Sequence, residues 1–199
     1  MSNYAQLSEL KAALRITDSV DDTQLNIALT SASRWVDGWC DRTFAAAGTA
    51  ITYRDFVPVD TFGIVHIDDC VQVTEVRIDD DLDQTYAKTL RAIDWAAEPV
   101  NATTYGLTLP FTRLRSYEDG YWPVWRGQPT VRVYARYGWP AVPEPVKQAT
   151  ILQASRLFTR LDSPLGVAGM GDMGVMRVSR FVDPDVEQLL LPYRRVRYA

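Results

Sequence analysis

The chain has 199 residues, 47% of them hydrophobic and 23% charged, which is enough apolar material for one elaborated domain or two small ones. Its formal net charge of -4 argues against a protein that grips nucleic-acid phosphates over its whole surface. Two cysteines and one histidine exclude a disulfide scaffold and a zinc site, and they predict reduced, buried thiols at Cys40 and Cys70.

The N-terminal third is predicted to be helical. A short helix over Leu7–Leu14 is followed by acidic residues that can cap a second helix, from about Asp22 to Trp39. One face of the second helix is apolar at helical spacing, and we expect it to be core. That face comprises Leu25, Ala28, Leu29, Ala32, Trp35, Val36 and Trp39.

From about Thr49 the pattern changes to short β-type runs separated by turn residues. In Val71–Ile78 polar and apolar residues alternate for most of the run, as in a half-buried strand. We therefore predict a small antiparallel β domain. Its expected strands are Ile51–Val57, Phe62–Ile67, Val71–Ile78, Thr89–Ile93, Phe111–Arg115 and Thr130–Tyr137.

After Pro143 the pattern is helical again, because proline is tolerated in a first helical turn. We predict a helix from about Glu144 to Leu161 and a two-turn helix capped by Asp183 and ended by Pro192.

These elements predict an α+β fold with two parts. Residues 1–48 and 137–199 form a small helical core, and residues 49–136 form an inserted antiparallel β domain. The first residues lack a basic region followed by an apolar one, so we expect no signal peptide. No run of about 18 apolar residues is present, so we expect no membrane span.

No catalytic, metal or cofactor site is predicted. Gly169–Gly174 spells G-x-G-x-x-G, but it follows a helix and precedes a strand-like run, whereas a dinucleotide site needs a strand before and a helix after. The acidic run Asp79–Asp83 lacks calcium-loop spacing and is interpreted as a solvated turn. His66 has no accompanying nucleophile motif.

Two features are candidate contacts between subunits. Met170, Met173 and Met176 lie in a glycine-rich loop, where methionine offers adaptable apolar contacts that a neighbouring subunit could order. Leu152 falls among polar residues on the outer arc of its helix. An ordinary surface loop and an ordinary exposed leucine are the alternatives.

The C-terminal segment is rich in arginine and tyrosine, which are common at interaction hot spots. We interpret it as a docking peptide for a partner; a DNA contact and a solvated terminus are the alternatives. The candidate residues are Leu189, Leu190, Tyr193, Arg194, Arg195, Arg197 and Tyr198.

Three segments together resemble one known family. They are Tyr4–Lys11, the helix start at Asp21–Asp22 with Ala32-Ser-Arg-Trp-Val-Asp37, and the last third from Tyr137 to Arg195. In combination they look like the gp6-like head-to-tail connector, or adaptor, proteins of tailed bacteriophages, of the actinobacteriophage type. The central β region is less diagnostic.

The resemblance implies a non-enzymatic virion protein of the phage neck, made in the host cytoplasm. It implies a ring, with twelve-fold symmetry, that joins the portal protein to a downstream head-closure or tail protein and lets DNA pass without sequence-specific binding. It also implies that the C-terminal segment contacts the portal. No cofactor is implied.

Two other roles stay open on the sequence. A head-closure or tail-terminator ring protein would have a similar pattern. A DNA-binding packaging factor of the small-terminase sort would need a basic recognition helix, and the helix from Asp22 to Trp39 carries one basic residue, Arg34.

Overall fold

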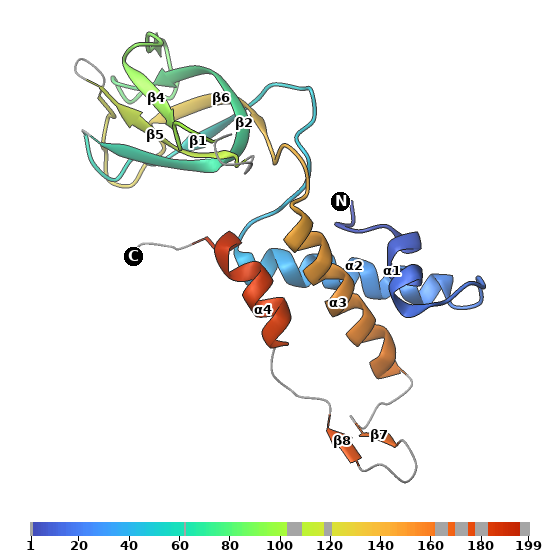
Figure 1. Cartoon of the computed structure of the whole chain (residues 1–199). Coiled ribbons are helices and arrows are strands. Elements are labelled where there is room, and N and C mark those ends of the chain that lie inside the picture. The colour runs from blue at the N-terminus through green and yellow to red at the C-terminus, as the bar shows by residue number, and fades with distance from the viewer. Residues whose placement is uncertain are drawn as a thin grey trace. The chain divides into compact units, whose positions relative to one another are not determined.

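The computed structural model describes residues 2–61, 63–102, 109–117, 121–161, 167–169, 175–177 and 183–195. They fall into two compact units, Met1–Ala45 with Val142–Ala199, and Ala46–Ala141 (Figure 1). The first unit is helical and the second is built on an antiparallel sheet. The predicted α+β class is therefore confirmed.

The helical unit contains α1 (Leu7–Leu14), α2 (Asp22–Cys40), α3 (Glu144–Leu161) and α4 (Pro184–Leu190), followed by the 3-10 helix η2 (Leu191–Tyr193). The predicted bounds of α1 and α3 are confirmed, and α2 runs one residue further than expected. Asp183 caps α4 as predicted, since its carboxylate accepts a hydrogen bond from the Asp185 N–H at 3.0 Å. Pro192 lies inside η2, so it changes the type of helix at the end of α4.

The core of this unit lies where α1, α2 and α3 meet. Each fully buried leucine contributes about 1.5–3 kcal/mol relative to an exposed one. Trp35 and Trp39 were expected in this core but are only half-buried, and they stack on each other instead. The core residues are Ala5, Leu10, Leu25, Leu29, Ala32, Ile151 and Ala154.

The second unit is a six-stranded sheet in the order β1-β6-β2-β5-β4, with the short β3 paired to β2. All the pairings are antiparallel. Its core includes Trp122 and Leu114, both fully buried. The strands are β1 (Thr52–Phe56), β2 (Ile64–Ile78), β3 (Lys88–Thr89), β4 (Trp95–Glu98), β5 (Phe111–Ser116) and β6 (Val131–Tyr137).

Strand β2 corrects the prediction of two separate strands on either side of residues 68–70. Its first part pairs with β5 and its second part with β6, and the register shifts on both sides at Cys70. Cys70 is fully buried and opposes both Phe111 and Tyr137, so the chain bends through a bulge here instead of turning.

Two further predictions for the sheet were wrong. The run Thr89–Ile93 is a strand only at its start, because a turn follows at Arg91. The Arg91 N–H donates to the Asp94 carboxylate, and the Asp94 N–H donates to the Arg91 carbonyl. Strand β4, Trp95–Glu98, was missed because alanine and glutamate are weak strand formers. Its pairing with β5 and the contacts of Glu98 with Arg113 and Arg115 hold it in the sheet.

Both cysteines are free and buried, as predicted. Burial raises the pKa of the Cys40 thiol to about 11 and that of Cys70 to about 12. No helix in the described part of the chain is long and apolar enough to cross a membrane.

Glu98 gives the sheet a pH-dependent contribution to stability. Hydrogen bonding to Arg115 at 2.6 Å and the nearby Arg113 lower the pKa of Glu98 below its usual value. A lowered folded-state pKa stabilises the fold above the unfolded pKa of about 4.3, and this stability is lost as pH falls through the folded value.

We expect Glu98→Gln to lower the free energy of unfolding at pH 7 by about 1–2 kcal/mol, since both arginines are partly exposed. It should also flatten the loss of stability that the parent protein shows as pH falls below about 5 and through the lowered pKa of Glu98. Urea unfolding at several pH values checks this. The control is Glu75→Gln, because the Glu75 side chain is more exposed than that of Glu98 and its pair with Arg77 should matter less. An unchanged pH profile in Glu98→Gln would refute the assignment.

Candidate assembly site

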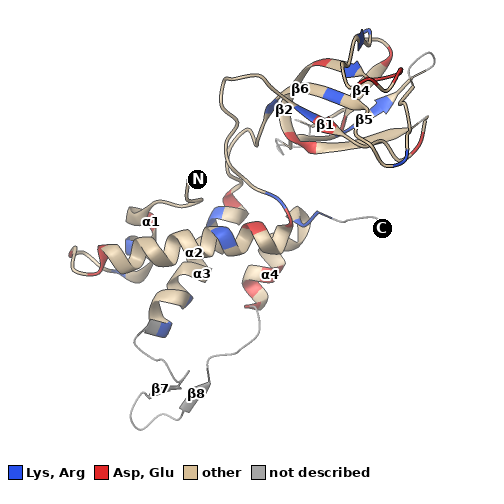
Figure 2. Ribbon diagram, turned by 180° about the vertical axis from the view of Figure 1, so that it is seen from behind, with Lys and Arg blue, Asp and Glu red and all other residues tan. Residues whose placement is uncertain are grey.

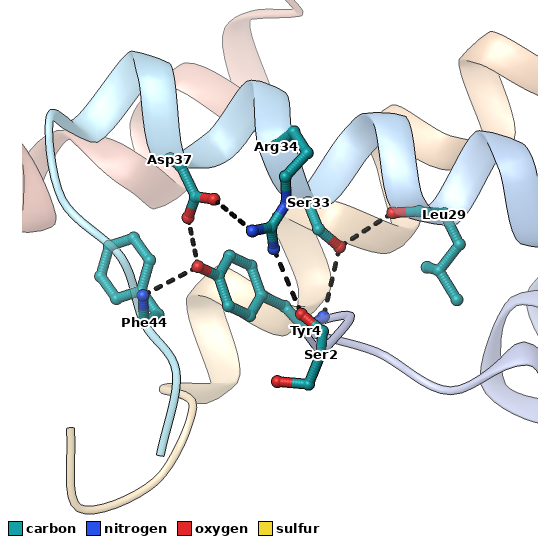
Figure 3. Close-up of polar contacts among 7 residues, drawn as sticks. All are labelled: Ser2, Tyr4, Leu29, Ser33, Arg34, Asp37 and Phe44. Carbon is teal, nitrogen blue, oxygen red and sulfur yellow. Dashed lines mark hydrogen bonds and ion pairs between the residues drawn. The ribbon is translucent and has the colours of Figure 1, made fainter. Parts of the chain in front are cut away.

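Hydrogen bonds of Tyr4 hold the N-terminal segment against α2 (Figure 3). The Tyr4 N–H donates to Ser33 Oγ at 3.2 Å, and the Tyr4 hydroxyl donates to the Asp37 carboxylate. Ser33 is buried and donates in turn to the Leu29 carbonyl at 2.8 Å. Ser33 and Asp37 are one turn apart on the same face of α2, so one tyrosine can bond to both.

Arg34 completes this polar cluster (Figure 3). Its guanidinium lies 3.0 Å from Asp37, donates to the Ser2 carbonyl at 3.2 Å, and lies over the Tyr4 ring. Burial raises the pKa of Asp37, although the Tyr4 hydrogen bond and the Arg34 charge oppose that rise. Burial and the Asp37 hydrogen bond also raise the pKa of Tyr4 well above its ordinary value. The carboxylate is thus partly desolvated and depends on these two partners.

Phe44 connects this cluster to the other end of the chain. Its N–H donates to the Tyr4 hydroxyl oxygen at 2.9 Å, and its ring packs edge-on against the Tyr4 ring at 5.7 Å between centroids. The Tyr193 ring packs edge-on against Phe44 at 6.0 Å. Phe44 is fully buried. Three rings therefore join the N-terminal segment, the residues after α2 and the C-terminal segment.

The C-terminal segment lies on the end of α2. The Arg195 N–H donates to the Cys40 carbonyl at 2.8 Å, and the Arg194 guanidinium lies over the Trp39 ring at 5.5 Å. The adjacent Leu191 is 61% exposed. The segment thus combines anchoring contacts with an exposed apolar side chain.

The predicted docking residues therefore occupy different environments. Leu190 is fully buried within the helical unit, while Leu189 and Tyr193 are half-buried and Arg194 is exposed. Leu190 contributes to the core of its own unit and does not offer a surface in this arrangement. Arg197 and Tyr198 lie outside the described residues.

Trp35 and Trp39 form a stacked pair with centroids 5.5 Å apart and an interplanar angle of 17°. The indole N–H of Trp39 is buried and has no hydrogen-bond acceptor among the described residues. Half-buried aromatic rings beside an arginine are typical of protein interfaces. Helical periodicity predicted that these tryptophans lie on the apolar face of α2. It could not predict how much of that face the other elements cover.

The predicted subunit contacts are placed in part. Leu152 is 36% exposed on α3, in agreement with its position on the polar arc. Met176 lies in β8 (Val175–Arg177), which pairs with β7 (Val167–Gly169). Met170 and Met173 lie outside the described residues. Strands flank the G-x-G-x-x-G sequence on both sides, so the strand-to-helix context of a dinucleotide site is not found here.

The acidic turn of the β unit has a structural explanation. The Asp79 carboxylate accepts hydrogen bonds from the Asp83 and Gln84 N–H groups, and Asp83 accepts one from Thr85. Side chains of Asp79, Asp81 and Asp83 lie within 4.8 Å of one another. Their hydrogen bonds cap the backbone of the turn, which agrees with the interpretation from spacing.

Most arginines of the β unit form ion pairs with nearby acids. Figure 2 marks the positions of basic and acidic residues along the chain. Arg132 forms a bidentate ion pair with Asp55, with N–O distances of 2.6 and 2.9 Å. Its guanidinium also lies over the Tyr53 and Tyr86 rings. Arg54 pairs with Asp68 at 2.6 Å. Compensated charges of this kind leave little free positive potential for a phosphate backbone.

The stability of the helical unit should depend strongly on Phe44. We expect Phe44→Ala to lower its free energy of unfolding by about 3–5 kcal/mol, because a fully buried ring is removed. Leu152→Ala, at a partly exposed site of the same unit, should cost under about 1 kcal/mol. Urea unfolding followed by tryptophan fluorescence measures both changes. Equal, small losses would show that Phe44 is not a central packing residue.

Comparisons with known proteins agree with this geometry. Residues 4–69 match the family model described as phage gp6-like head-tail connector protein. A search of curated protein sequences gave no match.

Two solved structures share the fold. One is from the neck of an empty gene transfer agent (GTA) particle computed with C6 symmetry, with 17% identity and a TM-score of 0.55. The other is from the virion of a native gene transfer agent particle, with 19% identity and a TM-score of 0.51. Each match covers 98% of this chain and 92% of the other. These structures show a shared fold, while the predicted resemblance to the gp6-like head-tail connector family is confirmed by the sequence match over residues 4–69.

Proposed function

We propose that the protein is a structural component of the neck of a phage-like particle, where it joins the portal to the tail or to a head-completion protein. The observation that carries the proposal is the match of residues 4–69 to the connector family. That segment contains Tyr4, Ser33, Arg34, Asp37 and Phe44, which fasten the N-terminal segment to α2. The matched sequence thus covers α1 and α2 of the helical unit, together with β1 and the first part of β2.

We infer a non-enzymatic role. Both thiols are buried with raised pKa values, which disfavours the reactive thiolate form. The acidic turn is used to cap backbone N–H groups, and Asp37 is held by Tyr4 and Arg34. These contacts stabilise the fold, and that structural role accounts for the residues without a catalytic one.

The proposal includes a ring of subunits with twelve-fold symmetry. One structural neighbour comes from a particle neck computed with C6 symmetry, and a ring of twelve subunits is compatible with a six-fold axis. A ring needs a heterologous interface that closes on itself. Leu152 on α3 and Met176 on β8 are the proposed contacts, with Met170 and Met173 adjacent in the sequence.

The C-terminal segment is proposed to bind the portal protein. Arg194 and Arg195, with Arg197 further along, can form two-pronged contacts with carboxylates, and Tyr193 and Tyr198 can add apolar area. Leu189 is half-buried at the end of α4 and can extend this surface. Leu190 supports the segment from within the core.

DNA is proposed to pass the ring without being held. The net charge of -4 and the paired arginines of the β unit support this, because an uncompensated basic surface would bind phosphates. The isolated protein is therefore expected to show no salt-dependent affinity for duplex DNA. Strong binding of that kind would instead favour the packaging-factor role.

The ring interface can be tested at Leu152. We expect Leu152→Asp to prevent ring formation while leaving the monomer folded, because a charge at a closing apolar interface must be desolvated. The measurement is native mass spectrometry of the protein with portal, with circular dichroism as the check on folding. Ala87→Asp, at an exposed site of the β unit, is the control. Unchanged rings in Leu152→Asp would exclude this residue from the interface.

The portal contact can be tested by charge reversal. Changing Arg194, Arg195 and Arg197 to Glu should weaken portal binding by about tenfold or more, since arginine-rich contacts contribute strongly to affinity. This change retains Tyr193 and its packing on Phe44. Arg160→Glu, on the exposed end of α3, is the control. Titration of purified portal would show equal affinities for both proteins if the segment does not dock there.

A further inference from the structure

After α4 ends, the C-terminal segment contacts Phe44 and the last residues of α2. Tyr193 is its half-buried ring, and the Arg195 N–H to Cys40 carbonyl bond is its backbone anchor. Leu191, between α4 and these anchors, is exposed. Tyr193 packs against a surface that the residues after α2 provide.

That surface is the ring of Phe44, and Phe44 is itself placed by Tyr4. The chain leaves α2 through Asp41, whose backbone is left-handed with φ of 52°. Three residues later the Phe44 N–H donates to the Tyr4 hydroxyl oxygen at 2.9 Å. The same hydroxyl donates its proton to the Asp37 carboxylate. One oxygen thus ties the residues after α2 to α2 itself.

We propose that Tyr4 is a positioning residue for the C-terminal docking segment. Its hydroxyl fixes the backbone at Phe44, and the Phe44 ring fixes Tyr193 and the residues that follow. This rests on the proposed function in one respect, because it describes how the portal-binding segment is held. The two ends of the chain are then energetically coupled, and the coupling acts equally in both directions.

A purely local role for Tyr4 predicts something different. In that case its hydroxyl would stabilise only the N-terminal segment, and loss of the hydroxyl would leave residues 191–195 unchanged. The edge-on contacts of Phe44 with both Tyr4 and Tyr193, at 5.7 and 6.0 Å, argue for transmission through the ring. The Arg195 amide reports on the position of the segment, because it stays protected only while the segment lies against the Cys40 carbonyl at the end of α2.

The test is amide hydrogen exchange in the full chain, without any partner. Tyr4→Phe keeps the ring and removes only the hydroxyl. We expect exchange at the Arg195 amide to become roughly three- to tenfold faster, the range for losing one part-buried hydrogen bond. Amides of α3 should keep their rates, which separates local release from global unfolding.

Tyr86→Phe is the matched control. Tyr86 is as buried as Tyr4, each residue being 3% exposed, and its hydroxyl donates to the Pro129 carbonyl at 2.8 Å in the β unit. This variant should leave Arg195 exchange unchanged. If Tyr4→Phe also leaves it unchanged, the proposal is wrong.

The reverse direction gives a second test. Tyr193→Leu should speed exchange at the Phe44 amide by roughly threefold, because coupling between two sites is reciprocal. If exchange at the Phe44 amide is unchanged in Tyr193→Leu, the proposal is also wrong. Both experiments use the isolated protein, so either result is independent of whether the segment binds a portal.

Discussion

The helical unit depends on one partly desolvated carboxylate. Asp37 loses hydration within the unit, and the Tyr4 hydroxyl and the Arg34 guanidinium replace that hydration. Removing either one would leave the carboxylate with a single partner in a partly desolvated place, which costs more than losing a surface contact. Because Tyr4 also binds Ser33 and Phe44, the same interaction fixes the N-terminal segment and the exit from α2. The C-terminal segment in turn packs against Phe44.

Much of the fold could be predicted from local pattern. Helical periodicity and caps predicted the bounds of α1 and α3. Alternation predicted the second part of β2, and a short β-type run between turn residues predicted β6. The failures have a non-local cause. The bulge at Cys70 is set by pairing to two strands, and β4 is held by β5 and two arginines rather than by its own propensity.

The site was less accessible from sequence. Tyr4 and Asp37 were visible only as parts of a family pattern, and nothing in the sequence linked them to Phe44 or Tyr193. The spacing of Ser33 and Asp37 on one helix face was a usable signal, but their partner lies 29 and 33 positions away. The exposure of individual side chains could not be predicted from the sequence either. Leu190 was predicted to contact a partner, whereas it is buried within the helical unit.

The central claim is that this protein is part of a neck ring, and cryo-electron microscopy of particles that carry it tests this most directly. The account predicts density for a ring of copies of this chain between portal and tail. The helices α2 and α3 of each copy should lie near those of the next copy, around a DNA channel. Density for this chain elsewhere in the particle, or its absence from the neck, would contradict the account.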